Sequence, residues 1–538
     1  MAMASYSTVL QLLLLLAMLV YLIQTLILPR RKSTCAASPP LPPGPTPWPV
    51  VGSLPEMLLS GMPAFRWIHH VMDNTDTGIA CVKLGGVHVI PISCPAIARE
   101  VLRTKHDANF ASRPLTLASR TFSRGYVDAV MSPYGDQWRR MRRVLAAEVV
   151  SASRHAWLAG KRTAEADHLT RYVYGLAAGG AGAAVDIRHV ARHYCGNVVR
   201  RLLFGARYFG EPRADGGPGP LERQHVDAVF AAVGLLYSFS VSDYLPCVCV
   251  AGLDLDGHER KVREAHETVS RLHDGVIDER RRRWESAERE EVDDLLDVLI
   301  TLKDNNGEPA LTAEEVKALA QDVTLAAMDN PSNAVEWAMA EMVTQPEMME
   351  KAAAELDAVV GRGRLVEERD IPRLNYLKAC IREAFRLHPV APFNVPHVAL
   401  EDATVAGYRV PKGSHVILSR VGLGRNPAVW EDPLRFDPDR HLLGSAAGDD
   451  DVVTLAENDL RFISFSAGRR GCIAASLGTA MSVMLFGRLL QGFSWRKPDG
   501  MAAVDLSESR HDLFMAKPLV LHAEPRLPAH LYTALSSM

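Results

Sequence analysis

The chain has 538 residues and a formal net charge of −3, from 60 lysines and arginines against 63 aspartates and glutamates. A charge this close to neutral gives no general basic field, so the composition argues against a nucleic acid as partner. Eight cysteines in 538 residues are too few for a disulfide framework and show no zinc spacing, which fits a reducing compartment. Chains of this length often divide into several domains, so one large domain would need independent support.

An apolar run occupies residues 9–28, about the length that spans a bilayer as a helix. No lysine or arginine precedes it, whereas Arg30, Arg31 and Lys32 follow it directly. This bias places the rest of the chain on the cytosolic side of the membrane. A cleaved secretory signal is the alternative, but its basic residues would precede the apolar run. We therefore expect residues 1–32 to be a retained transmembrane anchor with its basic flank.

A proline-rich segment follows the anchor, with prolines at 39, 40, 42, 43, 45, 47 and 49. Such a segment forms neither a helix nor an inner strand. We expect residues 33–50 to be a stiff hinge before a globular body at 51–538. In that body, apolar patterns predict helices at 65–71 and 96–102. They also predict two short strands within 79–92 that turn at Gly85 and Gly86.

An arginine-rich stretch runs from Trp138 to Arg143. Residues four apart share a helix face, so Trp138 and Arg142 are expected to point the same way. The arginines at 139, 140 and 143 fall on other faces. They form either a solvated basic surface or a docking surface for an acidic redox partner.

A glycine-rich run at 179–184 lacks the glycine spacing of a dinucleotide fingerprint and is interpreted as a flexible loop. The sequence shows no recognisable site for NADPH or flavin. Residues 262–291 predict a long charged helix, and residues 318–342 a long apolar one that contains Asp329, Asn330 and Pro331. Pro331 removes a helical N–H group, so a kink is expected there, of functional or purely structural meaning.

Glu383 and Arg386 are spaced to pair on one face of a predicted helix. Such a pair is usually a surface ion pair, but Arg440 lies between it and Cys472 and favours a cluster. Prolines at 389, 392 and 396 force an extended course after the helix. Residues 403–415 suggest a hairpin around Gly407, and residues 443–457 suggest a surface insertion.

Cys472 lies in a short loop between Gly468 and an apolar segment at 474–490. Glycines allow tight turns that can aim N–H groups at the sulfur, and a helix N-terminus beside it favours a negative charge. A thiolate held in this way is a strong iron ligand. For an isolated cysteine, a buried structural position would be the plainer interpretation.

The string Phe465-x-x-Gly468-x-Arg470-x-Cys472-x-Ala474 resembles the haem-binding loop of the cytochromes P-450, with Ala474 where most of the family has glycine. The resemblance covers essentially the whole chain and implies one mainly α domain of about a dozen helices with small β-sheets. It implies haem b, bound through the thiolate of Cys472. It further implies haem contacts at Phe465, Gly468, Arg470, Trp138, Arg142 and His397, and a buried charge cluster of Glu383, Arg386 and Arg440.

At the oxygen-binding helix the family has an acid followed by an alcohol that help to deliver protons. This chain keeps the acid, Asp329, but has Asn330 in place of the alcohol. With the segments 329–333 and 393–397, the cysteine loop is similar to those of the plant amino-acid N-monooxygenases, above all the tyrosine-using members from grasses. This implies two N-hydroxylations, dehydration and decarboxylation of an aromatic L-amino acid to an (E)-aldoxime, a first step towards cyanogenic glucosides or related defence compounds. L-tyrosine is the expected substrate and L-phenylalanine the alternative.

The resemblance also implies dioxygen as co-substrate and NADPH electrons delivered by a separate flavoprotein reductase. The protein is then expected in the endoplasmic reticulum membrane, single-pass, with its catalytic domain in the cytosol. A zwitterionic substrate needs a cationic or polar clamp, for which Arg120 and Arg124 are candidates. Phe393 and Asn394 are expected to border the distal pocket.

Two other classes remain open from the sequence. A haem-thiolate isomerase or lyase would need no reductase and no dioxygen, and the altered pair Asp329-Asn330 permits it. A non-catalytic haem binder or sensor would form no product at all. Turnover without NADPH, or the absence of turnover, separates these two classes from a monooxygenase.

Overall fold

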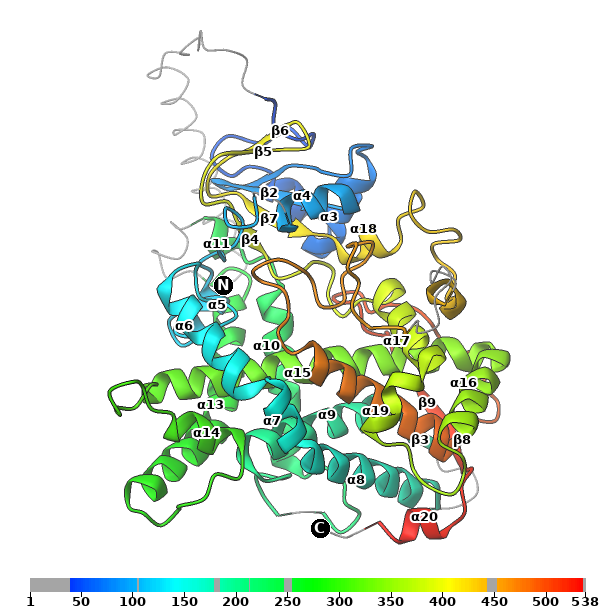
Figure 1. The fold of residues 1–538 in the computed structure, drawn as a ribbon. Coiled ribbons are helices and arrows are strands. Elements are labelled where there is room, and N and C mark those ends of the chain that lie inside the picture. Colours follow the sequence, from blue (N-terminus) through cyan, green and yellow to red (C-terminus); the bar gives the residue numbers. More distant parts are fainter. Residues whose placement is uncertain are drawn as a thin grey trace, which may run out of the picture.

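The computed structural model describes residues 39–103, 106–178, 184–211, 213–245, 254–442 and 452–535. The expected membrane anchor at 1–32 and residues 179–183 of the glycine-rich loop lie outside the described residues. Helices make up most of the described chain, and the strands form three small sheets (Figure 1). The prediction of a mainly α fold with small sheets is confirmed.

The largest sheet has the strand order β1-β2-β7-β4, formed by Val82–Leu84, Val87–Ile92, His415–Leu418 and His397–Val398. Strands β2 and β7 run parallel, although more than 300 residues separate them in sequence. Gly85 has a φ of 53° in the turn between β1 and β2, a conformation that favours glycine. The predicted pair of strands and its turn are therefore confirmed.

Two smaller sheets complete the set of strands. One has the order β3-β9-β8, from Ala184–Asp186, Val520–Pro525 and Phe493–Arg496. The other is the hairpin of β5 (Ala403–Val405) and β6 (Tyr408–Val410), whose turn places Ala406 and Gly407 at positive φ. The hairpin around Gly407 is confirmed, but it ends at Val410 because residues 415–418 pair with β2 instead.

Four long helices form the core: α8 (Ala159–Ala178), α9 (Ile187–Phe204), α15 (Ala313–Thr344) and α19 (Ala475–Gly492). Helix α15 crosses the middle of the molecule with α9 and α19 on its flanks (Figure 1). Most of its residues are buried, and these include polar side chains such as Asp322, Asp329 and Glu336 as well as apolar ones. The helix is continuous through Pro331, so any distortion from this proline stays within it.

The remaining helices surround this core. They are α2 (Leu54–Leu59), α3 (Ala64–Asp73), α4 (Pro95–Arg103), α5 (Leu117–Phe122), α6 (Asp136–Val144), α7 (Ala152–Trp157), α10 (Pro220–Leu236), α11 (Val241–Tyr244), α13 (His258–Glu285), α14 (Leu295–Thr301), α16 (Pro346–Val359), α17 (Asn375–Leu387), α18 (Arg420–Gly424) and α20 (His530–Thr533). A π-helical turn, η1 (Leu145–Val149), follows α6, and 3₁₀ turns occur at η2 (Glu368–Arg373) and η3 (Pro438–His441).

Two sequence expectations are corrected. The charged helix expected at 262–291 is α13 and ends at Glu285, where the chain reverses through Ala287 at a φ of 55°. The described end of the segment expected as a surface insertion, residues 452–457, is partly core. Leu455 and Glu457 are buried, and Glu457 binds the guanidinium groups of Arg382 and Arg461. The glycine- and aspartate-rich composition of residues 443–457 suggested a surface insertion, and composition does not show that Glu457 binds two arginines.

Within the described residues, one helical stretch, Pro220–Tyr244, is long and apolar enough to cross a membrane. Less than half of its most apolar part, 44%, is buried inside the fold. Core helices of soluble proteins share this composition, so the stretch is weak support for a membrane span.

Candidate active site

The cysteine loop is a tight turn that joins the core to α19. Gly468 has a φ of 72°, and a Cβ at this position would lie 2.2 Å from the carbonyl oxygen of Leu102. Only glycine therefore fits here without moving the neighbouring chain. The N–H of Cys472 donates to the carbonyl of Phe465 at 2.8 Å, which closes the turn. The loop thus fixes the direction of the Cys472 side chain.

The thiol of Cys472 faces an internal cavity of about 310 Å³. Burial raises its pKa, while the N–H of Ala474 and the charges of Arg142 and Arg420 act in the opposite direction. The helix after it, α19, begins at Ala475, as the sequence predicts. A free thiol here is therefore held mostly protonated, and a bound cation would be needed to draw the proton off.

Helix α6 carries Trp138 and Arg142, of which Arg142 lines this cavity and Trp138 lies beside it. The Arg142 guanidinium donates to the carbonyl of Gly471 at 2.7 Å and lies 5.7 Å from the Trp138 ring. Trp138 is 5% exposed, and its buried Nε1–H has no hydrogen-bond partner among the described residues. A buried donor without an acceptor is costly, so this indole indicates a ligand that accepts its proton.

Three further basic residues surround the same end of the cavity. Arg470 donates to the carbonyls of Ala111 and Ser132, both at 2.6 Å. Arg113, which the sequence analysis did not identify, donates to the carbonyls of Val395 and Pro396 at 2.7 and 2.8 Å. His397 shares a 2.7 Å hydrogen bond with the carbonyl of Phe110 through Nδ1.

Burial and neighbouring positive charges lower the pKa values of these basic residues. Burial and the charge of Arg113 lower the pKa of Arg470 to about 8, and burial lowers the pKa of Arg113 to about 10. Burial, followed by the charge of Arg113, lowers the pKa of His397 to about 3, so its imidazole is neutral. The pocket therefore holds several positively charged side chains out of contact with water. It would be stabilised by an anionic group, as buried charges require a partner.

The other side of the cavity is formed by α15. Asp329 is 3% exposed, and its Oδ1 has no hydrogen-bond partner among the described residues. Burial raises its pKa to about 7, although Arg192 and Arg420 act to lower it. Asn330 and Pro331 line the same cavity. The structure thus places Asp329 and Asn330 in one cavity with Cys472.

The proposed substrate residues divide into two groups. Asn394 lines the cavity and accepts a 2.7 Å hydrogen bond from the N–H of Leu418. Phe393 does not line it but stacks on His69 with ring centroids 4.7 Å apart.

The structure brings neither Arg120 nor Arg124 to the cavity. Arg120 is exposed, and Arg124 is engaged by Asp274 and Glu314 on α13 and α15. Both precede Trp138 in sequence, but α5, which contains Arg120 and ends two residues before Arg124, packs against α13.

Arg420 is a second cavity arginine that the sequence analysis missed. It is the first residue of α18 and lines the cavity with Asp329 and Cys472. Its Nε is buried and has no hydrogen-bond partner among the described residues. Its sequence context, a single arginine after a short strand, gives no signal of this role, because Arg420 and Asp329 come to one cavity only in the folded chain.

The structure brings together the three residues of the expected charge cluster. Glu383 accepts hydrogen bonds from Arg386 at 2.8 and 2.7 Å and from Arg440 at 3.0 Å. His441 is a further member that the sequence analysis did not identify, with Nε2 at 2.8 Å from Glu383. Arg386 also donates to the carbonyls of Gly424 and Pro433, so the cluster ties α17 to the segment before η3.

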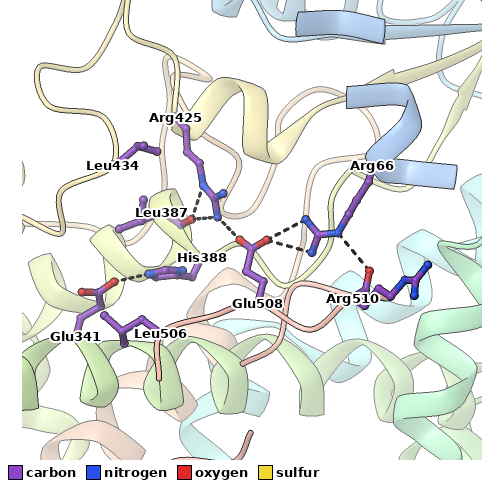
Figure 2. A pocket seen from close by; sticks show the side chains of 9 residues that line it. All are labelled: Arg66, Glu341, Leu387, His388, Arg425, Leu434, Leu506, Glu508 and Arg510. Atoms are coloured by element: carbon purple, nitrogen blue, oxygen red, sulfur yellow. Dashed lines mark hydrogen bonds and ion pairs between the residues drawn. The ribbon is translucent and has the colours of Figure 1, made fainter. Parts of the chain in front are cut away.

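A second cavity, of about 660 Å³, shares no lining residue with the first (Figure 2). Figure 2 shows Glu508 between Arg66 and Arg425, and His388 bound to Glu341 at 2.7 Å. Most of its charged side chains are paired with one another, although Nδ1 of His388 has no hydrogen-bond partner among the described residues. The cavity at Cys472 brings a thiol together with the unpartnered Oδ1 of Asp329 and Nε of Arg420, so it is the candidate active site, although it is the smaller of the two.

The chain belongs to the cytochrome P450 family, whose family model, described as Cytochrome P450, matches residues 42–522. A tyrosine N-monooxygenase of Sorghum bicolor is 70% identical to it, with 99% of this chain and 96% of the relative covered. A phenylalanine N-monooxygenase of Prunus mume is 52% identical, with 92% and 91% covered. A zebrafish cytochrome P450 structure with progesterone has a TM-score of 0.68 at 22% identity, and covers 87% of this chain and 100% of that chain.

Membership of this family implies haem, a redox partner and a monooxygenase reaction, and such proteins are typically membrane-bound. The cavity fits a haem. Its thiol, from Cys472, can bind iron, and the unpartnered indole N–H of Trp138 can bind a carboxylate. Among the described residues, Arg113, Arg142 and Arg470 form no salt bridge, and only Asp128 acts as a nearby anion on Arg113 and Arg470, so two propionate groups would add the negative charge that these buried cations favour. The neutral His397 contributes as a hydrogen-bonding group and not as a charge.

Proposed function

We propose that this chain converts L-tyrosine into (E)-4-hydroxyphenylacetaldehyde oxime by two N-hydroxylations, a dehydration and a decarboxylation. The observation that carries the proposal is the cavity with opposite, unsatisfied charges at Asp329 and Arg420 in a chain 70% identical to a tyrosine N-monooxygenase. L-phenylalanine, which gives phenylacetaldoxime, is the second candidate, because a phenylalanine N-monooxygenase is 52% identical.

When bound, haem supplies the activation of dioxygen. Cys472 would hold the haem iron through its thiolate. Trp138, Arg142 and Arg470 would hold the carboxylates of the cofactor. Asp329 has the proton chemistry suited to an amine substrate, because a carboxyl with a pKa of about 7 can take up a proton at Oδ1 and return it near neutral pH. Asn330 offers a donor and an acceptor that do not ionise.

The reaction balances with external electrons. Each amino acid consumes two dioxygen molecules and two NADPH, with two protons, and gives the aldoxime, carbon dioxide and three water molecules. We propose that a separate flavoprotein reductase delivers the electrons of NADPH. The sequence supports this, since it shows no recognisable site for NADPH or flavin.

We also propose that residues 1–32 anchor the protein in the endoplasmic reticulum membrane, with 51–538 as a cytosolic domain behind the hinge at 33–50. The apolar run and its basic flank support this placement. Deletion of residues 1–32 should move the protein from the microsomal to the soluble fraction and leave haem binding intact. Loss of the thiolate-type carbon monoxide spectrum in soluble truncated protein would contradict the domain boundary.

The proposed reaction is tested by reconstituting the enzyme with a flavoprotein reductase and feeding L-tyrosine and L-phenylalanine in competition. The expected product is mainly 4-hydroxyphenylacetaldehyde oxime, formed only with NADPH and dioxygen. Phenylacetaldoxime as the main product would select the second candidate. Turnover without NADPH would instead indicate a haem-thiolate isomerase or lyase, and no product from any amino acid would indicate a binder or sensor.

A further inference from the structure

Arg420 and Asp329 present opposite charges to one cavity from two different helices. Asp329 belongs to the central helix α15, whereas Arg420 begins α18 behind the strand β7. The buried Oδ1 of Asp329 and the buried Nε of Arg420 both lack hydrogen-bond partners among the described residues. The two groups influence each other, since Arg420 lowers the pKa of Asp329, but they form no ion pair in the described structure. They therefore leave room for a ligand between them.

The position of Arg420 is fixed by its surroundings. Its N–H donates to the carbonyl of Pro392 at 2.9 Å, and Ser419 caps α18 through a 2.7 Å hydrogen bond from the N–H of Gly422. Asn394 and Leu418 exchange two hydrogen bonds, at 3.0 and 2.7 Å, just before this point. The start of α18 is thus tied to the segment that borders the cavity. A site built on such supported backbone can orient a ligand.

We propose that Arg420 binds the α-carboxylate of the amino-acid substrate while Asp329 and Asn330 face its amino group. This inference rests on the proposed function and deepens it. A guanidinium suits a carboxylate because its N–H groups can form two parallel, charge-assisted hydrogen bonds. An ammonium in turn suits an acceptor such as the carboxylate of Asp329. The zwitterion complements both unsatisfied groups at once, which neither an alcohol nor an amine alone would do.

This arrangement also assigns a direction to the rest of the substrate. Phe122, Val233 and Leu236 line the same cavity and give it an apolar region. An aromatic side chain is expected there, since apolar surface is favourably buried. Arg420 then acts as an amino-acid specificity residue, because it selects for the carboxylate that every α-amino acid carries and does not discriminate between side chains.

The test uses ligands that lack one charge each. L-tyrosine has both charged groups, tyramine lacks the carboxylate, and 3-(4-hydroxyphenyl)propionate lacks the amine. Binding to haem-loaded protein is measured by substrate-induced spectral titration and, independently of the spectrum, by equilibrium dialysis. Arg420→Gln should weaken L-tyrosine and 3-(4-hydroxyphenyl)propionate by roughly 10- to 100-fold. It should change tyramine binding by less than about threefold.

Two further variants complete the test. Arg420→Lys keeps the charge but not the planar fork, so an intermediate loss is expected for the two carboxylates. Arg420→Lys also provides the test if Arg420→Gln fails to bind haem. Arg120→Gln removes the same charge from an exposed position and should leave all three affinities unchanged. Equal losses for tyramine and L-tyrosine, or unchanged carboxylate binding in the Arg420 variants, would overturn the inference.

The experiment separates this inference from the proposed function. If the wild type binds L-tyrosine through a carboxylate preference that Arg420 controls, the inference stands even when no aldoxime forms. If the wild type forms the aldoxime and Arg420→Gln binds L-tyrosine as tightly, the inference alone fails.

Discussion

The carboxylate of Glu383 accepts two hydrogen bonds from the guanidinium of Arg386, at 2.8 and 2.7 Å, and neither side chain is exposed. Burial alone would raise the pKa of Glu383, but the hydrogen bonds from Arg386 and His441 outweigh it and bring the pKa to about 2. The pair lies on α17, and its partners link this helix to η3. The cluster therefore holds the scaffold behind the cysteine loop.

Arg386→Ala should lower the free energy of unfolding by about 3–5 kcal/mol, because it leaves the charge of Glu383 buried without its main partner. The check is urea unfolding followed by circular dichroism. Arg369→Ala breaks an exposed pair with Glu367 and is the matched control, with an expected change below about 0.5 kcal/mol. The pKa of Glu383 is lower in the folded protein than its usual value of 4.5. Ionised Glu383 therefore stabilises the fold above pH 4.5, and this contribution is lost as the pH falls towards 2. Equal effects of the two substitutions would contradict a buried cluster.

Trp138→Phe should speed the loss of haem, because it keeps the ring but removes the one N–H that has no protein partner. The expected weakening is roughly 1–3 kcal/mol, the range for a lost hydrogen bond to a charged group. Transfer of haem to apomyoglobin measures it. Trp157→Phe, on an exposed tryptophan, should transfer haem at the wild-type rate. Wild-type retention in Trp138→Phe would show that the indole does not bind the cofactor.

The sequence predicts those parts of the site that follow from local spacing. Trp138 and Arg142 share a helix face, Glu383 and Arg386 pair within one turn, and Gly468 is needed by a tight loop. Each of these features depends on residues that are close together in the chain, so the local sequence pattern is enough to predict how they are arranged.

The sequence analysis did not identify Arg113, Arg420 or His441. Their roles arise from contacts between distant segments, such as the bonds from Arg113 to residues 395 and 396. Arg120 and Arg124 were chosen for their sequence distance from Trp138, yet α5 packs against α13. Charge and proximity in sequence do not determine which face of the fold a side chain reaches.

Cys472→Ser should abolish the thiolate-type carbon monoxide spectrum and all turnover, because a hydroxyl does not replace the thiolate as ligand. The measurement is the reduced carbon monoxide difference spectrum, together with total haem content. Cys94→Ser, on a half-buried cysteine of the first sheet region, should retain both spectrum and activity. A Cys472→Ser protein that keeps its spectrum would exclude this residue as the iron ligand.

Binding of amines should strengthen between pH 6 and pH 8 through Asp329. Its pKa of about 7 means that the carboxyl is mostly protonated at pH 6 and ionised at pH 8, while an alkyl amine stays protonated. Titration of tyramine across this range should show the trend, and Asp329→Asn should remove it. The same raised pKa makes the stability of the fold change with pH in the opposite direction to amine binding. A raised folded-state pKa stabilises the protein most below pH 3.8, and the contribution is lost as the pH rises through 7. Identical pH profiles for wild type and Asp329→Asn would contradict this role.

Asn330 stands where the family pattern has an alcohol, and it lines the cavity beside Asp329. An amide both donates and accepts but does not ionise, so it can hold a water molecule or the polar head of the substrate. A zwitterionic substrate brings its own donors, which lessens the need for an alcohol. Asn330→Thr should therefore lower aldoxime formation, although it restores the general pattern, and should raise the share of NADPH electrons lost to peroxide.

Asn330→Ala should couple less well still and should weaken amino-acid binding by roughly 1–3 kcal/mol, because a buried partner is left without its hydrogen bond. Spectral titration gives the affinity, and the ratio of aldoxime formed to NADPH consumed gives the coupling. Asn306→Thr makes the same change at an exposed loop position and should match the wild type in both measurements. Wild-type affinity and coupling in Asn330→Thr would show that the amide has no role in the reaction, and that the cavity orients its substrate through Arg420 and Asp329 alone.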